Sequence, residues 1–275
     1  MSEEPVTYEV ADRVAWLTLN RPRVLNALNT ELAATLADHI ERAAHDRNAM
    51  LIVIRGAGRA FCSGMDRTAL AQGSVNEPFF REWIRGLNAL EDTGKLSIAV
   101  LHGYSIGGGL QLALACDFRI ATDDAIIGLG ATRHGLVPDG AVLRLARIVG
   151  LGRAKELALL NDEIPAAEAR AIGLVNWVCS AADLDRTVHG VIAKARAGSP
   201  TATAHTKRLL QESFHENPRG LIEDVVQSQN ACIASWEMVE ANQAWQEKRE
   251  AQFFQEGKGE PCQGSPSESS RQERS

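Results

Sequence analysis

The sequence predicts an α/β fold built on parallel strands, followed by a helical region. Two continuous apolar runs, MLIVIRG (50–56) and SIAVLHG (97–103), end in glycine, as strands buried on both faces do. Helical patterns lie between such runs, and this alternation is typical of a parallel sheet or of a spiral of β-β-α units. From about 182 to 250 only helical patterns follow, which indicates an α-helical C-terminal subdomain.

The individual elements follow from local patterns. Alternating apolar and polar residues predict a hairpin over 5–10 and 13–19, around a turn at Asp12. Helical spacing of apolar residues predicts a helix over 30–46, with Thr30 as its N-cap. The same patterns predict five further helices, over 78–93, over about 107–115 from the glycine run, and over 139–149, 151–160 and 165–171, the last opened by Pro165. They also predict strands over 117–122 and 174–179. The helical patterns after 182 are broken at Pro200 and Pro218.

Composition and charge exclude several classes of protein. The chain has 275 residues, a net charge of -6 and no Lys/Arg-rich run, which argues against a nucleic-acid-binding surface. Its acidic start lacks the features of a signal peptide, and no apolar segment is long enough to span a membrane. Five cysteines without C-x-x-C spacing favour free thiols in a reducing cytoplasm and no zinc site. We therefore expect a cytoplasmic protein.

Two glycine-containing stretches each follow a buried strand. In GYSIGGGLQ (103–111) the glycines open a helix, whose first N–H groups have no partner within the helix. Tight packing also selects glycine, and for this stretch alone packing is the better interpretation. The second stretch, GAGRAFCSGMD (56–66), ends in a similar exposed turn. Two such turns, about 43 residues apart, could converge on one oxygen as an oxyanion hole.

Five blocks of sequence together resemble the enoyl-CoA hydratase/isomerase (crotonase) family. The similarity covers about residues 5–250, in the family's order and spacing, and is carried by RPRVLNALN (21–29), GRAFCSGMD (58–66), HGYSIGGGLQLALACDFRIA (102–121), GLVPDG (135–140) and ARIVGLGRAKEL (146–157). The resemblance implies a spiral core of ββα repeats over 1–195, a helical oligomerisation region over 196–256 and a homotrimer or hexamer. It also implies an acyl-CoA thioester as the ligand. The tail, 257–275, has almost no apolar content and is predicted to be disordered.

The resemblance also implies roles for particular residues. The backbone N–H groups of Met65 and Gly108 would form the oxyanion hole, flanked by Gly64 and Gly107. Arg23 would meet the phosphates of coenzyme A. The remaining residues implied to surround the adenine and pantetheine are Asn26, Ala60, Asp66 and Arg67. Other interpretations stay open here, because Arg23 and Arg67 are equally compatible with surface arginines and Asp66 with a helix cap.

The sequence departs from the hydratases of the family at two positions. Hydratases place one carboxylate three residues after the oxyanion glycine and another four residues before the glycine of GLVPD. Here these positions are Gln111 and Ala131. Neither residue can take a proton from water at neutral pH, so efficient hydration of an enoyl-CoA is not expected. Gln111 could orient a thioester or a water, or fill the pocket as a satisfied amide.

One carboxylate remains in the GLVPD block. Asp139 occupies the position where isomerases of the family carry an acid/base, and apolar neighbours would raise its pKa. It could instead cap the predicted helix that follows. His134 is a weaker acid/base candidate, and Arg133 could pair with Asp139 and make the cluster structural. A dehalogenase branch uses an aspartate at the same place, but Ala131 stands where that branch has an aromatic residue.

The favoured function is double-bond isomerisation of an enoyl-CoA, or related enolate chemistry, with Asp139 as acid/base. The alternatives are a non-catalytic acyl-CoA-binding protein and, less favoured, a hydratase, hydrolase or lyase acting on a CoA thioester. Phe79, Phe80 and Trp83 suggest an apolar acyl group, although core packing explains them equally well. No metal, nicotinamide or flavin motif is present, so coenzyme A is expected only as part of the substrate.

Overall fold

The computed structural model describes residues 4–214 and 221–254. The chain divides into two compact units, 1–193 and 194–275, each described here by itself. Pro218 and the predicted disordered tail over 257–275 lie outside the described residues.

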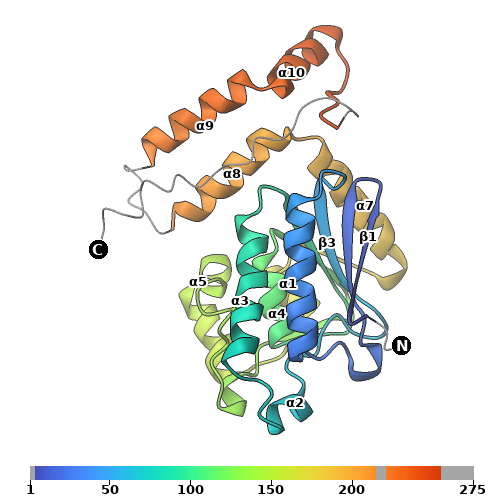
Figure 1. The fold of residues 1–275 in the computed structure, drawn as a ribbon, viewed down its shortest axis with the longest axis vertical. Coiled ribbons are helices and arrows are strands. Elements are labelled where there is room, and N and C mark those ends of the chain that lie inside the picture. Colours follow the sequence, from blue (N-terminus) through green and yellow to red (C-terminus); the bar gives the residue numbers. More distant parts are fainter. Residues whose placement is uncertain (1–3, 215–220, 255–275) are drawn as a thin grey trace. The chain divides into compact units, whose positions relative to one another are not determined.

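The first unit is built on a six-stranded sheet with the order β1-β2-β3-β4-β6-β9, of which Figure 1 labels β1 and β3. All neighbouring strands run parallel except the β1–β2 hairpin. The strands are β1 (Val6–Ala11), β2 (Val14–Leu19), β3 (Leu51–Gly56), β4 (Leu96–Leu101), β6 (Phe118–Thr122) and β9 (Trp177–Cys179). The predicted parallel sheet and N-terminal hairpin are confirmed.

A second, smaller sheet has the order β5-β7-β8. Its strands are β5 (Tyr104–Ile106), β7 (Ile126–Gly128) and β8 (Ile164–Pro165). Two sheets connected by helices agree with the crotonase fold that the resemblance implies.

Helix α4 (Gly108–Ala115) packs against β4 and β6 of the large sheet and β5 of the small one, and all eight of its residues are buried. A helix that is apolar on nearly every side is stable only in such a position. At its C-terminal end the buried guanidinium of Arg119 donates to Ala113 O (3.2 Å), Cys116 O (2.8 Å) and Leu174 O (2.7 Å). Carbonyls at the end of the helix are thereby satisfied by a cation.

Helices α1 (Thr30–His45) and α3 (Glu77–Asp92) pack along each other beside the sheet (Figure 1). The predicted N-cap of α1 is off by one residue. Asn29 has extended backbone dihedrals, and its side chain accepts from Leu32 N (3.0 Å), so Thr30 is the first helical residue. The short helix α2 (Arg67–Ala71) lies between α1 and α3 in the chain.

The predicted helix over 139–149 is wrong at its start. Residues 139–144 form turns, and α5 (Leu145–Lys155) begins only after Arg144. The N–H of Gly140 donates to Gln111 Oε1, so it takes no part in helical bonding. Gly150, at φ +77°, then interrupts α5, which is followed by a π-helical turn (Glu156–Leu160) and by α6 (Ala166–Ala171).

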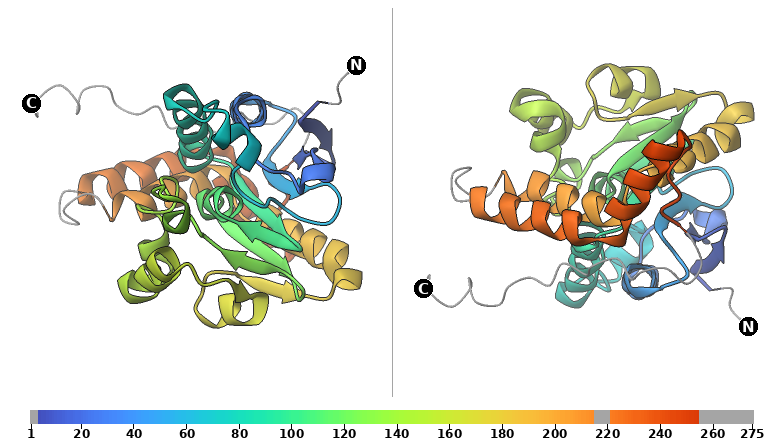
Figure 2. Two further views of the ribbon diagram at one scale, coloured as in Figure 1. Left: turned by 90° about the horizontal axis from the view of Figure 1, so that it is seen from below. Right: turned by 90° about the horizontal axis from the view of Figure 1, so that it is seen from above.

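Helix α7 (Leu184–Arg196) crosses the boundary between the units. The second unit contains α8 (Pro200–Glu212), α9 (Ile222–Ala234) and α10 (Trp236–Glu247), with α8 and α9 side by side (Figure 2). Ser199 and Ser235 cap α8 and α10 by accepting from Ala202 N and Met238 N. None of the helices in the described part of the chain is long and apolar enough to cross a membrane.

Candidate active site at the start of helix α4

The two glycine-containing loops lie against each other because β3 and β4 are parallel neighbours that end at the same sheet edge. Phe61 N donates to His102 O (2.9 Å) and Cys62 N to Tyr104 O (3.0 Å). Ile106 N donates back to Cys62 O (3.0 Å). The loop after β3 is thus hydrogen-bonded to the segment that leads into α4, so the two glycine-containing stretches lie side by side.

Packing and backbone conformation account for the three glycines. Gly107 has φ +56°, a region that L side chains rarely adopt. A Cβ on Gly108 would lie 2.1 Å from Leu28 Cδ1, and one on Gly109 would lie 2.4 Å from Cys62 O. The glycines therefore let the two loops approach each other, as the packing interpretation proposed.

This packing leaves two backbone donors free of protein acceptors. Leu28 N donates to Gly64 O (2.7 Å) and Asp66 N donates to Leu28 O (2.8 Å), so the intervening N–H of Met65 points away from Leu28. Gly108 is the first residue of α4, where an N–H has no partner within the helix. Within residues 4–214 and 221–254, neither N–H donates to a protein group.

Gln111 lies one turn further along α4 and is only 5% exposed. Its Oε1 accepts from the indole Nε1 of Trp83 (3.1 Å) and from the backbone N of Gly140 (2.9 Å). The Trp83 ring also lies near Gly108, since a Cβ added to that glycine would be 3.5 Å from Trp83 Cζ2. Trp83, Gln111 and the 139–140 turn are therefore contiguous with the Gly108 donor.

Asp139 directly precedes Gly140 in this turn, and its carboxyl group is poorly satisfied. Its Oδ2 is buried, and in the described part of the chain no group donates to it. Burial raises the pKa of Asp139 above its ordinary value, an effect opposed by the N–H groups of Gly140 and Asp139 and by the charge of Arg144. Because α5 begins at Leu145 without a side-chain cap, Asp139 is not the N-cap of that helix.

Arg144, whose charge lowers the pKa of Asp139, is part of a buried network that sequence reasoning missed. Its guanidinium donates to Gly140 O (3.0 Å) and Asn88 Oδ1 (2.9 Å) and forms an ion pair with Glu91. Arg144 therefore secures the 139–144 turn to α3. Its signal in the sequence was a charged residue, Arg144, within the largely apolar stretch 141–150, which indicates a buried cation with partners.

The other candidates near Asp139 take no part in the cluster. Arg133 donates to Asn161 O (3.2 Å), so the proposed pairing with Asp139 is not formed. His134 is exposed at the end of a 3-10 turn (Thr132–His134). Ala131 precedes that turn, and its carbonyl accepts from the backbone of His134 and Leu136.

The residues expected to surround coenzyme A fall into two groups. Asn26 is fully buried, and its Nδ2 donates to the carbonyls of Ala57 (2.9 Å), Ala60 (2.8 Å) and Phe61 (3.1 Å). Its Oδ1 accepts from Arg21 N (2.8 Å). Asn26 thus shapes the loop from inside, while Ala60 is itself fully buried.

Asp66 acts as the helix cap that was one of its two interpretations. Its side chain accepts from Thr68 N and Ala69 N at the start of α2, and it pairs with Arg21 (3.1 Å). Burial alone would raise the pKa of Asp66, but these hydrogen bonds and the arginine outweigh it and hold the pKa below its usual range. Arg23 and Arg67 are exposed and form no ion pair with any described carboxylate, which leaves both guanidinium groups available to a ligand.

The three aromatic residues expected to line the acyl pocket or the core have different surroundings in the structure. Phe79 is fully buried in the core, with the partly buried Phe80 against it edge-on. Trp83 is also buried in the core, and its indole Nε1 donates to Gln111 Oε1, a contact that sequence reasoning did not predict. The carbonyl of a buried glutamine needs a hydrogen-bond donor, and a Trp indole N–H on a nearby helix is a suitable one. The sequence therefore held a clue to this contact.

Cys62 is not an activated nucleophile, and the described residues hold no cluster of metal ligands. Burial raises the pKa of the Cys62 thiol to about 12, so it is not a thiolate at neutral pH. No group of three or more His, Cys, Asp or Glu side chains in the described ranges is arranged to hold a metal ion.

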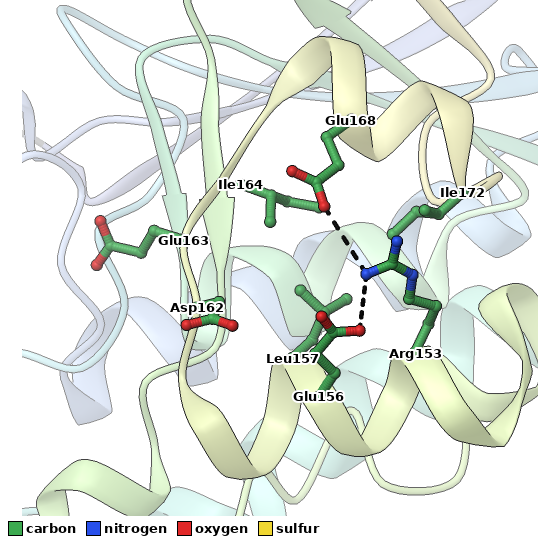
Figure 3. Close-up of a pocket in the computed structure, with 8 residues that line it drawn as sticks. All are labelled: Arg153, Glu156, Leu157, Asp162, Glu163, Ile164, Glu168 and Ile172. Carbon is green, nitrogen blue, oxygen red and sulfur yellow. Dashed lines mark hydrogen bonds and ion pairs between the residues drawn. The ribbon is translucent and has the colours of Figure 1, made fainter.

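A separate pocket of about 250 Å³ lies on α5 and α6 (Figure 3). Arg153 points between Glu156 (2.7 Å) and Glu168 (3.9 Å), and Asp162 and Glu163 add further negative charge. Four carboxylates around one paired arginine would repel a phosphate-bearing ligand. This pocket is therefore not a site for coenzyme A.

Comparison with known proteins agrees with this geometry. The model of the enoyl-CoA hydratase/isomerase family matches residues 9–256. The chain is 31% identical to the crotonyl-CoA hydratase of Syntrophomonas wolfei (92% of this chain, 99% of that protein) and 30% identical to the short-chain-enoyl-CoA hydratase of Clostridium acetobutylicum (90% and 97%). It also superposes on the crystal structure of enoyl-CoA hydratase from Mycobacterium tuberculosis, with TM-score 0.82 and 31% identity over 92% of this chain and 99% of that one. The chain therefore belongs to the enoyl-CoA hydratase/isomerase, or crotonase, family.

Proposed function

We propose that this protein binds an acyl-CoA thioester and catalyses enolate chemistry, most simply the shift of a double bond from C3–C4 to C2–C3. One observation carries the proposal. Asp139 has a buried, unpartnered carboxylate oxygen, and it directly precedes Gly140, whose N–H donates to Gln111 Oε1 on α4. An unsatisfied buried carboxylate costs stability, and such costs are concentrated at functional sites.

In this proposal the thioester oxygen accepts hydrogen bonds from Met65 N and Gly108 N. Asp139 takes a proton from C2, and the electron pair of the C2–H bond becomes the enolate that the two donors stabilise. The same carboxylic acid then returns the proton to C4, and the double bond forms between C2 and C3. Each donor would contribute roughly 3 kcal/mol to stabilisation of the enolate.

The raised pKa of Asp139 suits this role. A carboxylate whose pKa lies above the ordinary range is a stronger base and still releases its proton to carbon in the second step. Hydration needs a group that activates water, and the Oε1 of Gln111 already accepts from two protein donors. This supports isomerisation over hydration, although the relatives named above are hydratases.

The test uses 3-enoyl-CoA and 2-enoyl-CoA in D₂O, followed by mass spectrometry and NMR, with wild type and Asp139→Asn. We expect wild type to move the double bond and introduce deuterium at C2 and C4, and the variant to lose at least about 10²-fold of that rate. Water addition at comparable speed would refute the isomerase assignment. Tight binding without any exchange would favour the alternative, a non-catalytic acyl-CoA-binding protein.

We also propose that copies of the chain associate as a trimer or a pair of trimers. Large apolar side chains are exposed on the helices of the second unit, including Leu210 (63%), Val239 (66%) and Trp245 (80%). Exposed apolar groups of this size are typical of interfaces. Light scattering of the purified protein measures the oligomeric state directly.

A further inference from the structure

Gly140 lies where the 139–144 turn meets two helices. A Cβ added to this glycine would be 2.5 Å from Leu87 Cδ1 on α3 and 2.7 Å from Gln111 Oε1 on α4. A side chain does not fit at this position, so glycine lets the turn approach both helices. Asp139 directly precedes Gly140 in the chain, and its position therefore depends on how this glycine is held.

The two peptide groups on either side of Gly140 are each hydrogen-bonded to a side chain. The Gly140 N–H donates to Gln111 Oε1 (2.9 Å), and the Gly140 carbonyl accepts from Arg144 Nη1 (3.0 Å). A peptide group is planar and includes the Cα of the preceding residue. The bond to Gln111 therefore restrains the Cα of Asp139, from which the carboxylate extends, and the bond to Arg144 restrains the peptide that follows.

Both of these side chains are anchored to helix α3. The Oε1 of Gln111 also accepts from Trp83 Nε1 (3.1 Å). Arg144 Nη2 donates to Asn88 Oδ1 (2.9 Å) and forms an ion pair with Glu91. The side chains of this pair are only 7% and 24% exposed, so water screens their attraction incompletely, and loss of one partner would leave a buried charge without compensation. Glu91 therefore keeps the Arg144 guanidinium in place.

The residues of α3 that act on the turn lie on one face of the helix. Trp83, Leu87 and Glu91 are spaced four residues apart, and this spacing forms a single stripe along a helix. Trp83 supports the N–H side of Gly140 through Gln111, Leu87 lies directly against the glycine, and Glu91 supports the carbonyl side through the arginine. One rigid element thus sets the position of the turn from both sides.

We propose that Glu91, acting through Arg144, is a positioning residue that holds the Asp139 carboxylate in its productive orientation. This inference rests on the proposed acyl-CoA function and adds to it the element that supports the acid/base. Without Glu91 the turn would lose one of its two anchors, and Asp139 would shift relative to the Met65 and Gly108 donors. A displacement of about 1 Å can slow a reaction by about 10²-fold. Binding of the thioester does not use the Asp139 carboxylate and should change little.

The test measures kcat and KM for conversion of 3-enoyl-CoA to 2-enoyl-CoA. Glu91→Ala should lower kcat by at least about tenfold and leave KM within about twofold of wild type. Glu91→Gln keeps an oxygen that can accept from Arg144 and should restore most of the rate. Glu82→Ala is the matched control, because Glu82 lies on the same helix and pairs with Arg85 instead. This control should have the kcat of wild type.

Hydrogen exchange without substrate separates loss of the anchor from general loosening of the fold. In protein labelled with ¹⁵N-glycine, Glu91→Ala should speed exchange of the Gly140 amide at least about tenfold more than that of Gly86, which reports opening of α3 itself.

Two outcomes overturn the inference while the proposed function stands. In the first, Glu91→Ala has the kcat of wild type. In the second, its lower kcat is accompanied by equal acceleration of exchange at both glycines, which would make the role of Glu91 merely structural. If wild type neither moves the double bond nor introduces deuterium, the proposed function itself fails, and the inference fails with it.

Discussion

Substitution of Gly109 by alanine tests whether the two loops of the candidate site support each other rigidly. The new Cβ would lie 2.4 Å from Cys62 O, whereas ordinary contacts begin near 3.4 Å, so one segment must move by about 1 Å. The obstacle is backbone that is hydrogen-bonded to Tyr104 and Ile106, not a flexible side chain. Overpacking of this kind costs about 1–3 kcal/mol, against a helix-propensity gain of up to about 1 kcal/mol.

We therefore expect Gly109→Ala to lower the free energy of unfolding by about 1–2 kcal/mol, measured by urea titration with circular dichroism. A displacement of about 1 Å at the Gly108 donor should also lower the rate of thioester deuteration by about 10²-fold. Gly190→Ala is the matched control, because this exposed position in α7 has nothing within 4 Å of the added Cβ. It should stabilise the protein by about 0.5–1 kcal/mol. The reasoning is refuted if Gly109→Ala is as stable as Gly190→Ala and as active as wild type.

Four further outcomes are expected. Because the pKa of Asp139 is raised in the folded protein, the folded state binds a proton more readily than the unfolded state, and the free energy of unfolding falls as pH rises from about 4 through that raised pKa. At pH 8 the free energy of unfolding of D139A, measured by urea titration, should therefore exceed that of wild type by about 1 kcal/mol, and at pH 4 this difference should vanish. N26A removes three donated hydrogen bonds and leaves buried carbonyls unsatisfied, so its thermal unfolding should report a loss of about 3 kcal/mol. R144M leaves Glu91 without its cation, which should lower the free energy of unfolding in urea by about 2–4 kcal/mol. The loss of positive charge should also raise the pKa of Asp139 and move the acid limb of the pH–rate profile to higher pH. R23E should weaken coenzyme A binding by about tenfold in calorimetry and leave the unfolding midpoint unchanged, since the side chain is exposed.

Much of the large sheet was predictable because its signals are local. Continuous apolar runs such as 50–56 are typical of strands covered on both faces, and the structure contains β3 at that place. The convergence of the two loops followed from the same information, because parallel neighbours end at one edge. The cap of α1 shows the limit of local signals. Asn29 and Thr30 are both good capping residues, and the backbone conformation of the preceding turn decides between them.

The candidate site depended on contacts between distant parts of the chain. The turn over 139–144 looked helical because its sequence is helix-compatible, but Gly140 donates its N–H to a residue 29 positions earlier. Trp83 could be assigned to the core or to a pocket wall with equal reason until its indole was placed against Gln111. Asn26 was expected in a loop around the ligand, and the sequence did not reveal that its buried side chain holds this loop together by donating to Ala60 O.

The clamp on Gln111 also bears on how this family can change its chemistry. Trp83 and Gly140 require only a planar oxygen at the end of the side chain, and glutamate offers that oxygen as well as glutamine does. In the genetic code the two residues differ by a single base, C or G at the first codon position. One point mutation could therefore exchange the amide NH₂ for a carboxylate oxygen while the contacts of Trp83 and Gly140 stay in place, so the fold would tolerate a change of chemistry at this position.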